Sequence, residues 1–254
     1  MSVGTDLASR YLDGITERLH TIVATQAESV RRAAQLMAAQ IQHDRLIHVY
    51  GAGGHSYVGS EEFFWRAGGL ANINPMFEAS LALAGGGQKS TLLERVEGIG
   101  DKIVRAYHLG PDDLLIITSA YGLNACTIDA ALEARRRGCR LIGISSFEFA
   151  RQTPRDFPAR HSSGLNLFEI ADVAIDNHVP HGEAFVDVPG FDQKVGGTCT
   201  VLTNFCVNWL VIETVQLCRQ MGLTPPVWRS ANVIGGDEAN RRLLEQYVPR
   251  VKAL

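Results

Sequence analysis

Residues 112–124 read DDLLIITSAYGLN and carry the clearest strand signal in the chain. Two aspartates precede the apolar run 114–118, which leads straight into a loop containing serine and glycine. A helical stretch follows at about 126–137 and stops at Gly138, and another apolar strand comes at 140–145. Continuous apolar strands alternating with helices are typical of a parallel sheet covered on both faces. This stretch therefore predicts an α/β fold.

The alternation extends to both sides of this stretch. Further strands are expected at 46–50, 70–73 and 171–176, and residues 76–108 are expected to be helical with an interruption at glycines 85–87. Apolar residues recur at intervals of three and four within 5–42, which predicts one or two amphipathic helices. A long apolar helix is expected at 198–221, with Thr198 as its N-cap, and a short one at 237–247. We predict a flavodoxin-like, doubly wound, five-stranded parallel sheet with an N-terminal helical arm.

Domain organisation and composition are those of an ordinary globular protein. We expect one domain over 1–254, divided into the arm (1–43), the sheet domain (44–222) and a C-terminal tail (223–254). With 46% hydrophobic residues and a net charge of −3, the chain lacks the basic signature of a nucleic-acid binder. No apolar run approaches the ~20 residues that span a bilayer, and no signal-like segment opens the chain. Five cysteines without a C-x-x-C pair favour a reduced, cytoplasmic location.

Two loops have a composition suited to holding phosphate. GAGGHS (51–56) and SAYGLN (119–124) each follow a predicted strand and precede a helix. In open parallel sheets, ligands bind beyond the carboxyl ends of the strands. Glycines allow close backbone approach, and helix N-termini and hydroxyl groups supply hydrogen-bond donors. The predicted substrate-binding residues are Gly51, Gly53, Gly54, His55, Ser56, Ser119, Tyr121, Gly122, Asn124, Lys194 and Thr198.

Other interpretations of these loops stay open. The first loop begins like the dinucleotide fingerprint G-x-G-x-x-G, but Ser56 stands where the third glycine belongs. No acidic residue follows a clear second strand at the usual spacing, because Glu78 lies too far on. The two loops could also be plain tight strand–helix turns. The second serine-bearing loop favours phosphate over a nucleotide, and no cofactor is predicted.

The chain resembles the sugar isomerase (SIS) domain, and in particular its UPF0309 branch. The resemblance rests on GAGGHSYVGSEEFFWRAGGLANINP, ITSAYGLN, RHSSGLNLFEIADVAIDN, KVGGTCT and PPVWRSANVIGGDEAN, spread over about 46–240. It implies a five-stranded parallel sheet, dimerisation, and phosphate binding by Ser56 and Ser119. Where the family pattern reads S-x-S-G, this chain has Tyr121 in place of the second serine. Either the ligand sits differently or Tyr121 closes over it.

Three residues are candidates for acid–base chemistry. Aldose–ketose isomerisation needs a base, usually a carboxylate, that moves a proton between adjacent carbons. Glu62 is the first candidate because it lies on the helix that opens the first loop, and Glu94 is the second. His161, in the long polar stretch 146–168, is a candidate for ring opening. Each could equally be a solvated charge or a loop residue.

Metal and covalent chemistry have weaker signals. His178 and His181 flank Pro180 with Glu183 nearby, but extended residues three apart face opposite sides. No metal site is therefore predicted. No G-x-S-x-G elbow appears, so nothing supports a covalent nucleophile.

The predicted function is sugar-phosphate binding with aldose–ketose isomerisation through an enediol. A non-catalytic sugar-phosphate sensor and a sugar-phosphate lyase or etherase are the alternatives. Long helices near both ends favour a homo-oligomer, either a dimer or a tetramer.

Overall fold

Five parallel strands form the central sheet of the protein, which we describe from a computed structural model covering residues 7–254. Their order is β2-β1-β3-β4-β5. This is the flavodoxin-like order, so the predicted fold class is confirmed. The strands are β1 (Ile47–Tyr50), β2 (Ile73–Pro75), β3 (Leu114–Thr118), β4 (Arg140–Ser145) and β5 (Val173–Asp176).

Strand burial explains why these residues form the sheet. All five residues of β3 are buried, as are all four of β1, so neither strand shows the alternation of a half-exposed strand. Ile47 of β1 lies between Ile73 of β2 and Leu114 of β3. The strand order reverses between β1 and β3, and open α/β sheets bind ligands at the carboxyl end of such a switch point.

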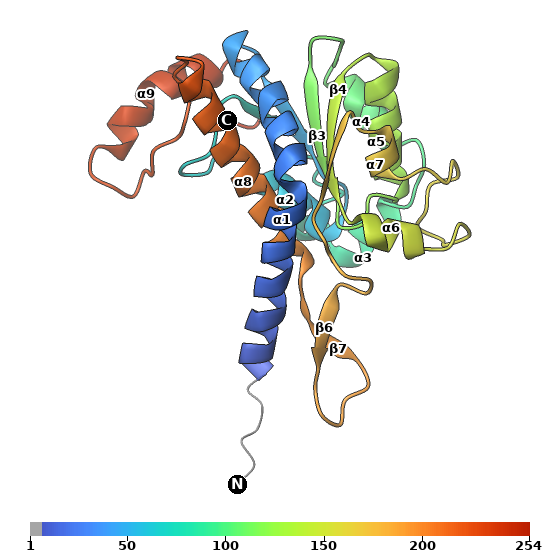
Figure 1. The fold of residues 1–254 in the computed structure, drawn as a ribbon. Coiled ribbons are helices and arrows are strands. Elements are labelled where there is room, and N and C mark those ends of the chain that lie inside the picture. Colours follow the sequence, from blue (N-terminus) through green and yellow to red (C-terminus); the bar gives the residue numbers. More distant parts are fainter. Residues whose placement is uncertain (1–6) are drawn as a thin grey trace.

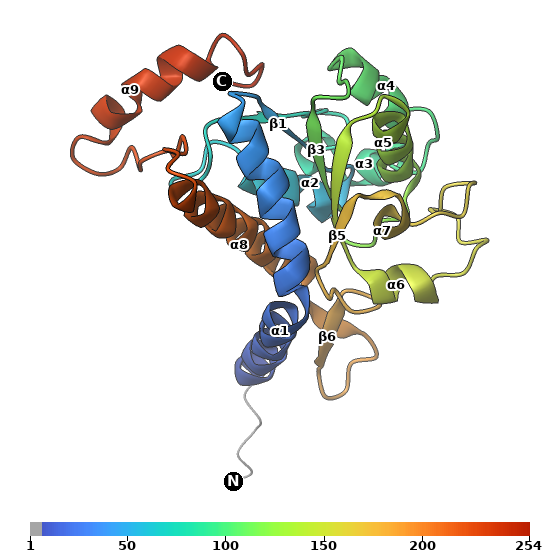
Figure 2. The same cartoon turned by 45° about the horizontal axis from the view of Figure 1, so that its top comes forward.

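Helices cover both faces of the sheet (Figures 1 and 2). On one face, Val49 and Ile116 pack with residues of α1 (Leu7–Gln42) and α8 (Cys199–Gln220). On the other face, Leu115 and Ile117 pack with residues of α4 (Gly100–Ala106), α5 (Ala125–Arg136) and α7 (Leu167–Ile170). Shorter elements complete the layers: α2 (Gly54–Glu62), η1 (Leu83–Gly85), α3 (Gly87–Leu93) and α6 (Phe147–Gln152).

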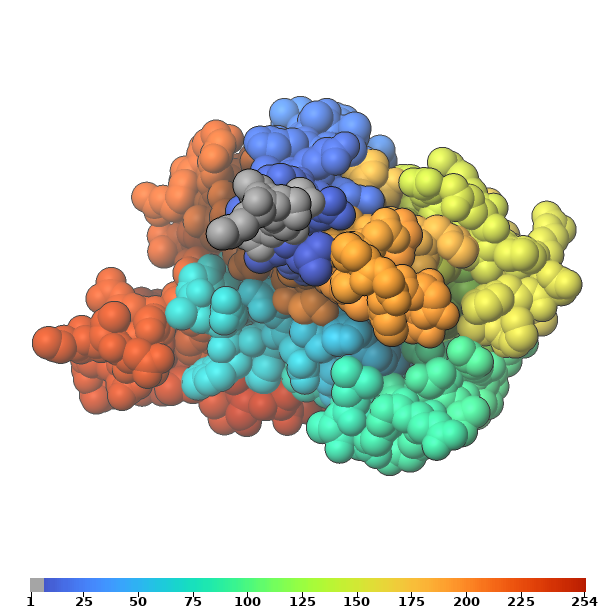
Figure 3. Space-filling view, turned by 90° about the horizontal axis from the view of Figure 1, so that it is seen from below, coloured from blue at the N-terminus to red at the C-terminus, as the bar shows by residue number. Residues whose placement is uncertain are grey.

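The N-terminal arm is one continuous helix of 36 residues, α1, and not two. Residues 1–6 of the predicted arm lie outside the described residues. The first turns of α1 pack on an antiparallel hairpin of β6 (Ala184–Asp187) and β7 (Lys194–Gly197), which the sequence analysis missed. Tyr11 stacks on Phe185 of β6 at 5.7 Å and donates a hydrogen bond to the Gly197 carbonyl at 2.8 Å. In Figure 3 this hairpin, in orange, lies on the face at which the parallel strands end.

Two predicted elements differ from the structure. The strand expected at 70–73 is β2, which begins only at Ile73, because Leu70 instead bridges to Val227 of the C-terminal segment. The helical stretch expected at 76–108, with its interruption at glycines 85–87, consists instead of loops and the short helices η1, α3 and α4. Gly86 and Gly98 have positive φ angles of 118° and 85°, which end helical turns. The tail helix α9 (Gly236–Tyr247) is present and lies apart from the sheet layers (Figure 2).

Helix α8 is long and apolar enough to cross a membrane by length and composition, contrary to the sequence expectation that no such run exists. It lies along α1, and Leu202, Cys206 and Leu210 belong to the same core cluster as Val30 and Met37 of α1. Interior packing accounts for the buried part of this apolar composition, while Val201 and Ile212 of α8 stay exposed.

Candidate functional site

A cavity of about 390 Å³ opens at the carboxyl ends of β1 and β3, at the switch point of the sheet. Both predicted loops contribute to it, and helices α2 and α5 begin at its edge. The first N–H groups of a helix have no partner within the helix. Gly54 N–H of α2 donates to Ser90 Oγ at 3.3 Å and Cys126 N–H of α5 donates to the Glu94 carbonyl at 3.0 Å, so the other first-turn N–H groups are the candidate donors. The lining comprises Gly53, Gly54, His55, Ser56, Leu83, Thr91, Glu94, Arg95, Ala120, Tyr121, Asn124, Phe149, Phe157, Ala159 and Glu183.

Ser56 joins the two loops. Its Oγ accepts a hydrogen bond from the Ala120 N–H at 3.1 Å, across 64 residues of sequence. Its backbone carbonyl accepts from Thr118 Oγ1 at 2.8 Å. Because the hydroxyl acts as acceptor towards Ala120, its own proton is left to donate to a ligand in the cavity. His55 is exposed at the rim and lies 3.0 Å from the Thr200 hydroxyl of α8.

The second loop uses its residues differently from the prediction. Ser119 is 2% exposed, does not line the cavity, and its Oγ accepts the Gly122 N–H at 2.9 Å. Gly122 has φ 69°, and a Cβ there would collide with the Ser145 side chain. Tyr121 lines the cavity and stacks on Phe149 at 4.0 Å. Of the two serines that the resemblance implied, only Ser56 reaches the cavity.

Glu94 is the carboxylate that the structure brings to these loops. It directly follows α3, and its backbone carbonyl accepts the Cys126 N–H of α5 at 3.0 Å. Burial raises the pKa of Glu94 to about 7, while the Asn124 side chain donates a hydrogen bond that opposes this shift. A Cβ at Gly53, where φ is 72°, would collide with the Glu94 carboxylate. The glycine at 53 is therefore what allows Glu94 to approach the first loop.

Several predicted site residues lie elsewhere. Glu62 does not line the cavity: its Oε1 accepts from Arg66 Nε at 3.0 Å and from Asn208 Nδ2 at 2.9 Å. Lys194 is exposed on β7 and lies 3.8 Å from Asp187.

Three further predicted residues also lie outside the cavity lining. Thr198 is fully buried at the start of α8, where its Oγ1 donates to the Glu183 carbonyl at 2.8 Å. Gly51 supports the first turn, since a Cβ there would strike the Ser56 carbonyl. Gly122 lies in the second loop against the Ser145 side chain, as described above.

His161 holds the long polar loop in place. Its Nδ1 accepts from the Ser163 N–H at 3.0 Å, which leaves Nε2 to donate to Asp129 Oδ1 at 3.2 Å. The Ser162 N–H and hydroxyl bond to Glu97 next to it. Both nitrogens of the His161 ring are thus hydrogen-bonded to protein groups, and the ring does not line the cavity.

Sequence reasoning missed one acidic residue of the cavity. Glu183 lines it from the loop before β6, although the sequence drew attention to this residue only beside His178 and His181. Those two histidines contact different parts of the protein: His178 hydrogen-bonds to Thr25 at 3.0 Å, and the His181 ring stacks on Phe149 with centroids 4.7 Å apart. Within residues 7–254, no group of three or more His, Cys, Asp or Glu side chains is arranged to hold a metal ion.

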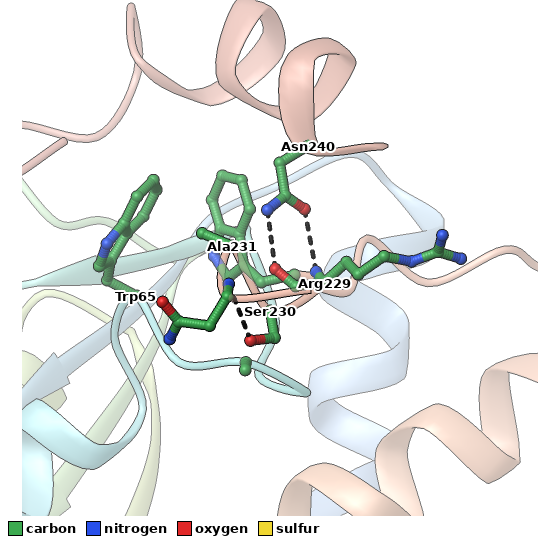
Figure 4. A pocket seen from close by; sticks show the side chains of 8 residues that line it. Trp65, Arg229, Ser230, Ala231 and Asn240 are labelled. Carbon is green, nitrogen blue, oxygen red and sulfur yellow. Dashed lines mark hydrogen bonds between the residues drawn. The ribbon is translucent and has the colours of Figure 1, made fainter. Parts of the chain in front are cut away.

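A second, smaller cavity of about 160 Å³ lies between the sheet domain and α9 (Figure 4). The Trp65 and Trp228 rings meet edge to face there, with centroids 4.8 Å apart. Asn240 reaches down from α9 and bonds both the N–H and the carbonyl of Arg229. In this smaller cavity the Asn240 side chain is thus hydrogen-bonded to the backbone of Arg229, and no carboxylate lines the cavity.

Comparison with known proteins identifies the family. Residues 10–146, more than half of the chain, match the SIS domain model, so the chain belongs to the SIS domain family. Within that family it is similar to UPF0309 proteins, which confirms the predicted branch. The protein of Geobacillus kaustophilus is 32% identical over 98% of this chain and 97% of its own length. The protein of Thermoanaerobacter pseudethanolicus is 38% identical over 96% of this chain and 98% of its own.

A solved structure shares the fold. A phosphoheptose isomerase from Francisella tularensis superposes with a TM-score of 0.53 at 14% sequence identity, covering 85% of this chain and 100% of that one. At this identity the likeness concerns the fold.

Proposed function

We propose that the cavity at the switch point binds a sugar phosphate and that the protein interconverts its aldose and ketose forms. The observation that carries the proposal is a part-buried carboxylate, Glu94, beside the N-termini of two helices in one cavity. The family and the isomerase that shares the fold support it. A phosphate monoester carries one to two negative charges, which directed N–H groups and the Ser56 hydroxyl stabilise without a lysine.

Glu94 replaces Glu62 as the proposed base. A general base works best when its pKa lies near the operating pH, and burial brings the pKa of Glu94 to about 7. In its ionised form it takes the proton from the carbon beside the carbonyl, which gives an enediol, and it returns the proton to the neighbouring carbon. Glu62 is engaged by Arg66 and Asn208 outside the cavity.

The aromatic side of the cavity holds the sugar in this proposal. Tyr121 and Phe149 stack, and His181 continues the stack beyond Phe149. Sugar C–H faces pack on aromatic rings, and the phenolic hydroxyl of Tyr121 can donate to a sugar or phosphate oxygen.

Solvent exchange tests the reaction. The protein is incubated with a panel of aldose and ketose phosphates in deuterated water, and deuterium is followed at the carbon beside the carbonyl. We expect binding and exchange in the wild type, binding without exchange in Glu94→Gln, and wild-type exchange in Glu62→Gln. Binding without exchange across the panel would instead identify a sensor. Loss of the phosphate-bearing or ether substituent from the substrate would identify a lyase or etherase.

Ser56→Ala tests the phosphate site. Hydrogen bonds to charged groups contribute about 1.5–3 kcal/mol, so affinity should fall roughly 10- to 100-fold. Ser119→Ala is the matched comparison, because that hydroxyl lies beneath the loop and bonds Gly122. Equal losses of affinity in both variants would place the phosphate elsewhere.

We further propose that the protein is a cytoplasmic homo-oligomer. All five cysteines are free and buried, which suits a reducing compartment. Large apolar side chains stay exposed on α1 and before α9, with Leu12 63% exposed and Ile234 fully exposed. Analytical ultracentrifugation of the wild type and of Ile234→Asp measures the association; a wild-type monomer at micromolar concentration would contradict it.

A further inference from the structure

Two carboxylates reach the cavity from distant parts of the chain. Glu94 follows α3, and Glu183 precedes β6; they are the two acidic side chains in the lining. The remaining ionisable groups there are His55 and Arg95, the phenol of Tyr121 at the aromatic side, and, next to Glu183, the thiol of Cys199. A site built only to hold an anionic phosphate gains nothing from a second carboxylate.

The backbone at Glu183 is held in an unfavourable conformation. Its φ of 65° lies in the left-handed region, where side chains other than glycine, asparagine and aspartate are rare. Its N–H donates to the Pro180 carbonyl at 2.9 Å. Its carbonyl accepts from both the N–H of Thr198, at 3.2 Å, and the Thr198 hydroxyl, at 2.8 Å. Strained residues that the surroundings fix in this way cluster at functional sites.

These backbone contacts do not require a glutamate. Glycine would adopt the same φ without strain and would present the same carbonyl to Thr198. The structural role of position 183 therefore leaves the carboxylate unexplained.

The Glu183 carboxylate is also oriented. Burial, then the neighbouring Glu183 charge, raises the pKa of the Cys199 thiol to about 11, so the thiol is neutral at pH 7 and hydrogen-bonds to Glu183. The charge of Glu183 contributes in turn to the raised pKa of Glu94. The two carboxylates thus act on each other within one cavity.

We propose that Glu183 is a second catalytic acid–base group, which transfers a proton between the two substrate oxygens while Glu94 transfers one between the two carbons. This inference rests on the proposed isomerase function. As Glu94 removes the C2 proton of the aldose, the C2 electrons form the C1–C2 double bond and the C1–O1 pair moves onto O1. The Glu183 carboxylate takes the O2 proton and gives it to O1, the C2–O2 carbonyl forms, and Glu94 returns its proton to C1. Both residues end as they began, and no external oxidant or reductant takes part.

The experiment compares exchange with conversion in Glu183→Gln. The amide can still donate to O1 but cannot carry a proton from O2 to O1. We expect binding close to that of the wild type, conversion of aldose to ketose lowered by about 100-fold or more, and deuterium exchange at C2 lowered much less. Asp187→Asn, an exposed carboxylate four residues on that pairs with Lys194, is the matched control and should behave as the wild type.

A measurement on the free protein separates the two proposals. Removing the Glu183 charge should lower the pKa of Glu94, read from the carbon-13 shift of its carboxyl during a pH titration. An unchanged Glu94 titration, or conversion in Glu183→Gln within about threefold of wild type, overturns the role of Glu183 while leaving the isomerase proposal standing. Binding without exchange in the wild type overturns the isomerase and this role with it.

Discussion

Replacing Glu94 by glutamine should make the protein more stable at alkaline pH, although it abolishes the proposed chemistry. Burial raises the pKa of Glu94 from 4.5 to about 7, so the folded state disfavours the ionised carboxylate. The unfolded chain loses this proton near pH 4.5 and the folded chain only near pH 7. The cost therefore builds up as the pH rises between these values and is complete above about pH 7.

The shift sets the size of the effect. A difference of about 2.5 pKa units, at about 1.36 kcal/mol each, gives an upper value near 3 kcal/mol, and the partial exposure of Glu94 reduces it to roughly 2–3 kcal/mol. In a chain of this length that corresponds to about 4–12 °C in Tm. Glutamine keeps an oxygen that accepts from Asn124, so little else changes.

Thermal unfolding of both proteins from pH 5 to pH 8.5 measures this gap. We expect the Tm of Glu94→Gln minus the Tm of the wild type to increase as the pH rises, most steeply between pH 5 and pH 7. Glu97→Gln is the control of opposite sign, because hydrogen bonds from Ser162 lower the pKa of that exposed carboxylate. It should lose stability relative to the wild type by a similar amount at every pH of this range, because the lowered pKa keeps that carboxylate ionised above about pH 4.5. A Tm difference for Glu94→Gln that is flat across the range would refute the raised pKa.

Three further predictions concern the site and the scaffold. The exchange rate at low substrate concentration should rise with pH through about 7 and then level off, because only ionised Glu94 acts as a base; a rate already level at pH 5.5 would exclude it. Gly53→Ala should lower exchange at least about tenfold, because the new Cβ displaces Glu94 and the positive φ costs roughly 1–2 kcal/mol; full exchange in a folded variant would contradict this. Glu133→Ala should cost about 1–3 kcal/mol in urea unfolding at pH 7, because the 3% exposed carboxylate binds Arg136 and Arg137 at 2.7 Å. Burial notwithstanding, these arginines lower the pKa of Glu133 to about 2, so its contribution is present above about pH 4.5 and should fade as the pH drops towards 2.

The sequence predicted the sheet and the two loops because both are local signals. Apolar runs such as 114–118 and glycine-rich turns after them have one simple structural solution. The hairpin β6–β7 escaped notice because each strand has only four residues: β6 is mostly half-buried, and β7 is largely exposed with two glycines, so no alternation marks them. The helical stretch expected at 76–108 was too long: besides the predicted interruption at glycines 85–87, the chain turns again at Gly98, where φ is 85°.

The choice between Glu62 and Glu94 depends on contacts that no local pattern contains. Glu62 is closer in sequence to the first loop, yet the helix turns it towards Asn208 of α8. Glu94 lies in the cavity because its carbonyl accepts a hydrogen bond from Cys126 at the start of α5 and because Gly53 leaves room for its side chain. Each of these contacts joins segments more than 30 residues apart, so they exist only once the sheet has brought the strand ends together. A part-buried carboxylate packed against a glycine of positive φ lowers stability at neutral pH. A scaffold this well packed has no structural need of it, and proton transfer is the chemistry that would benefit.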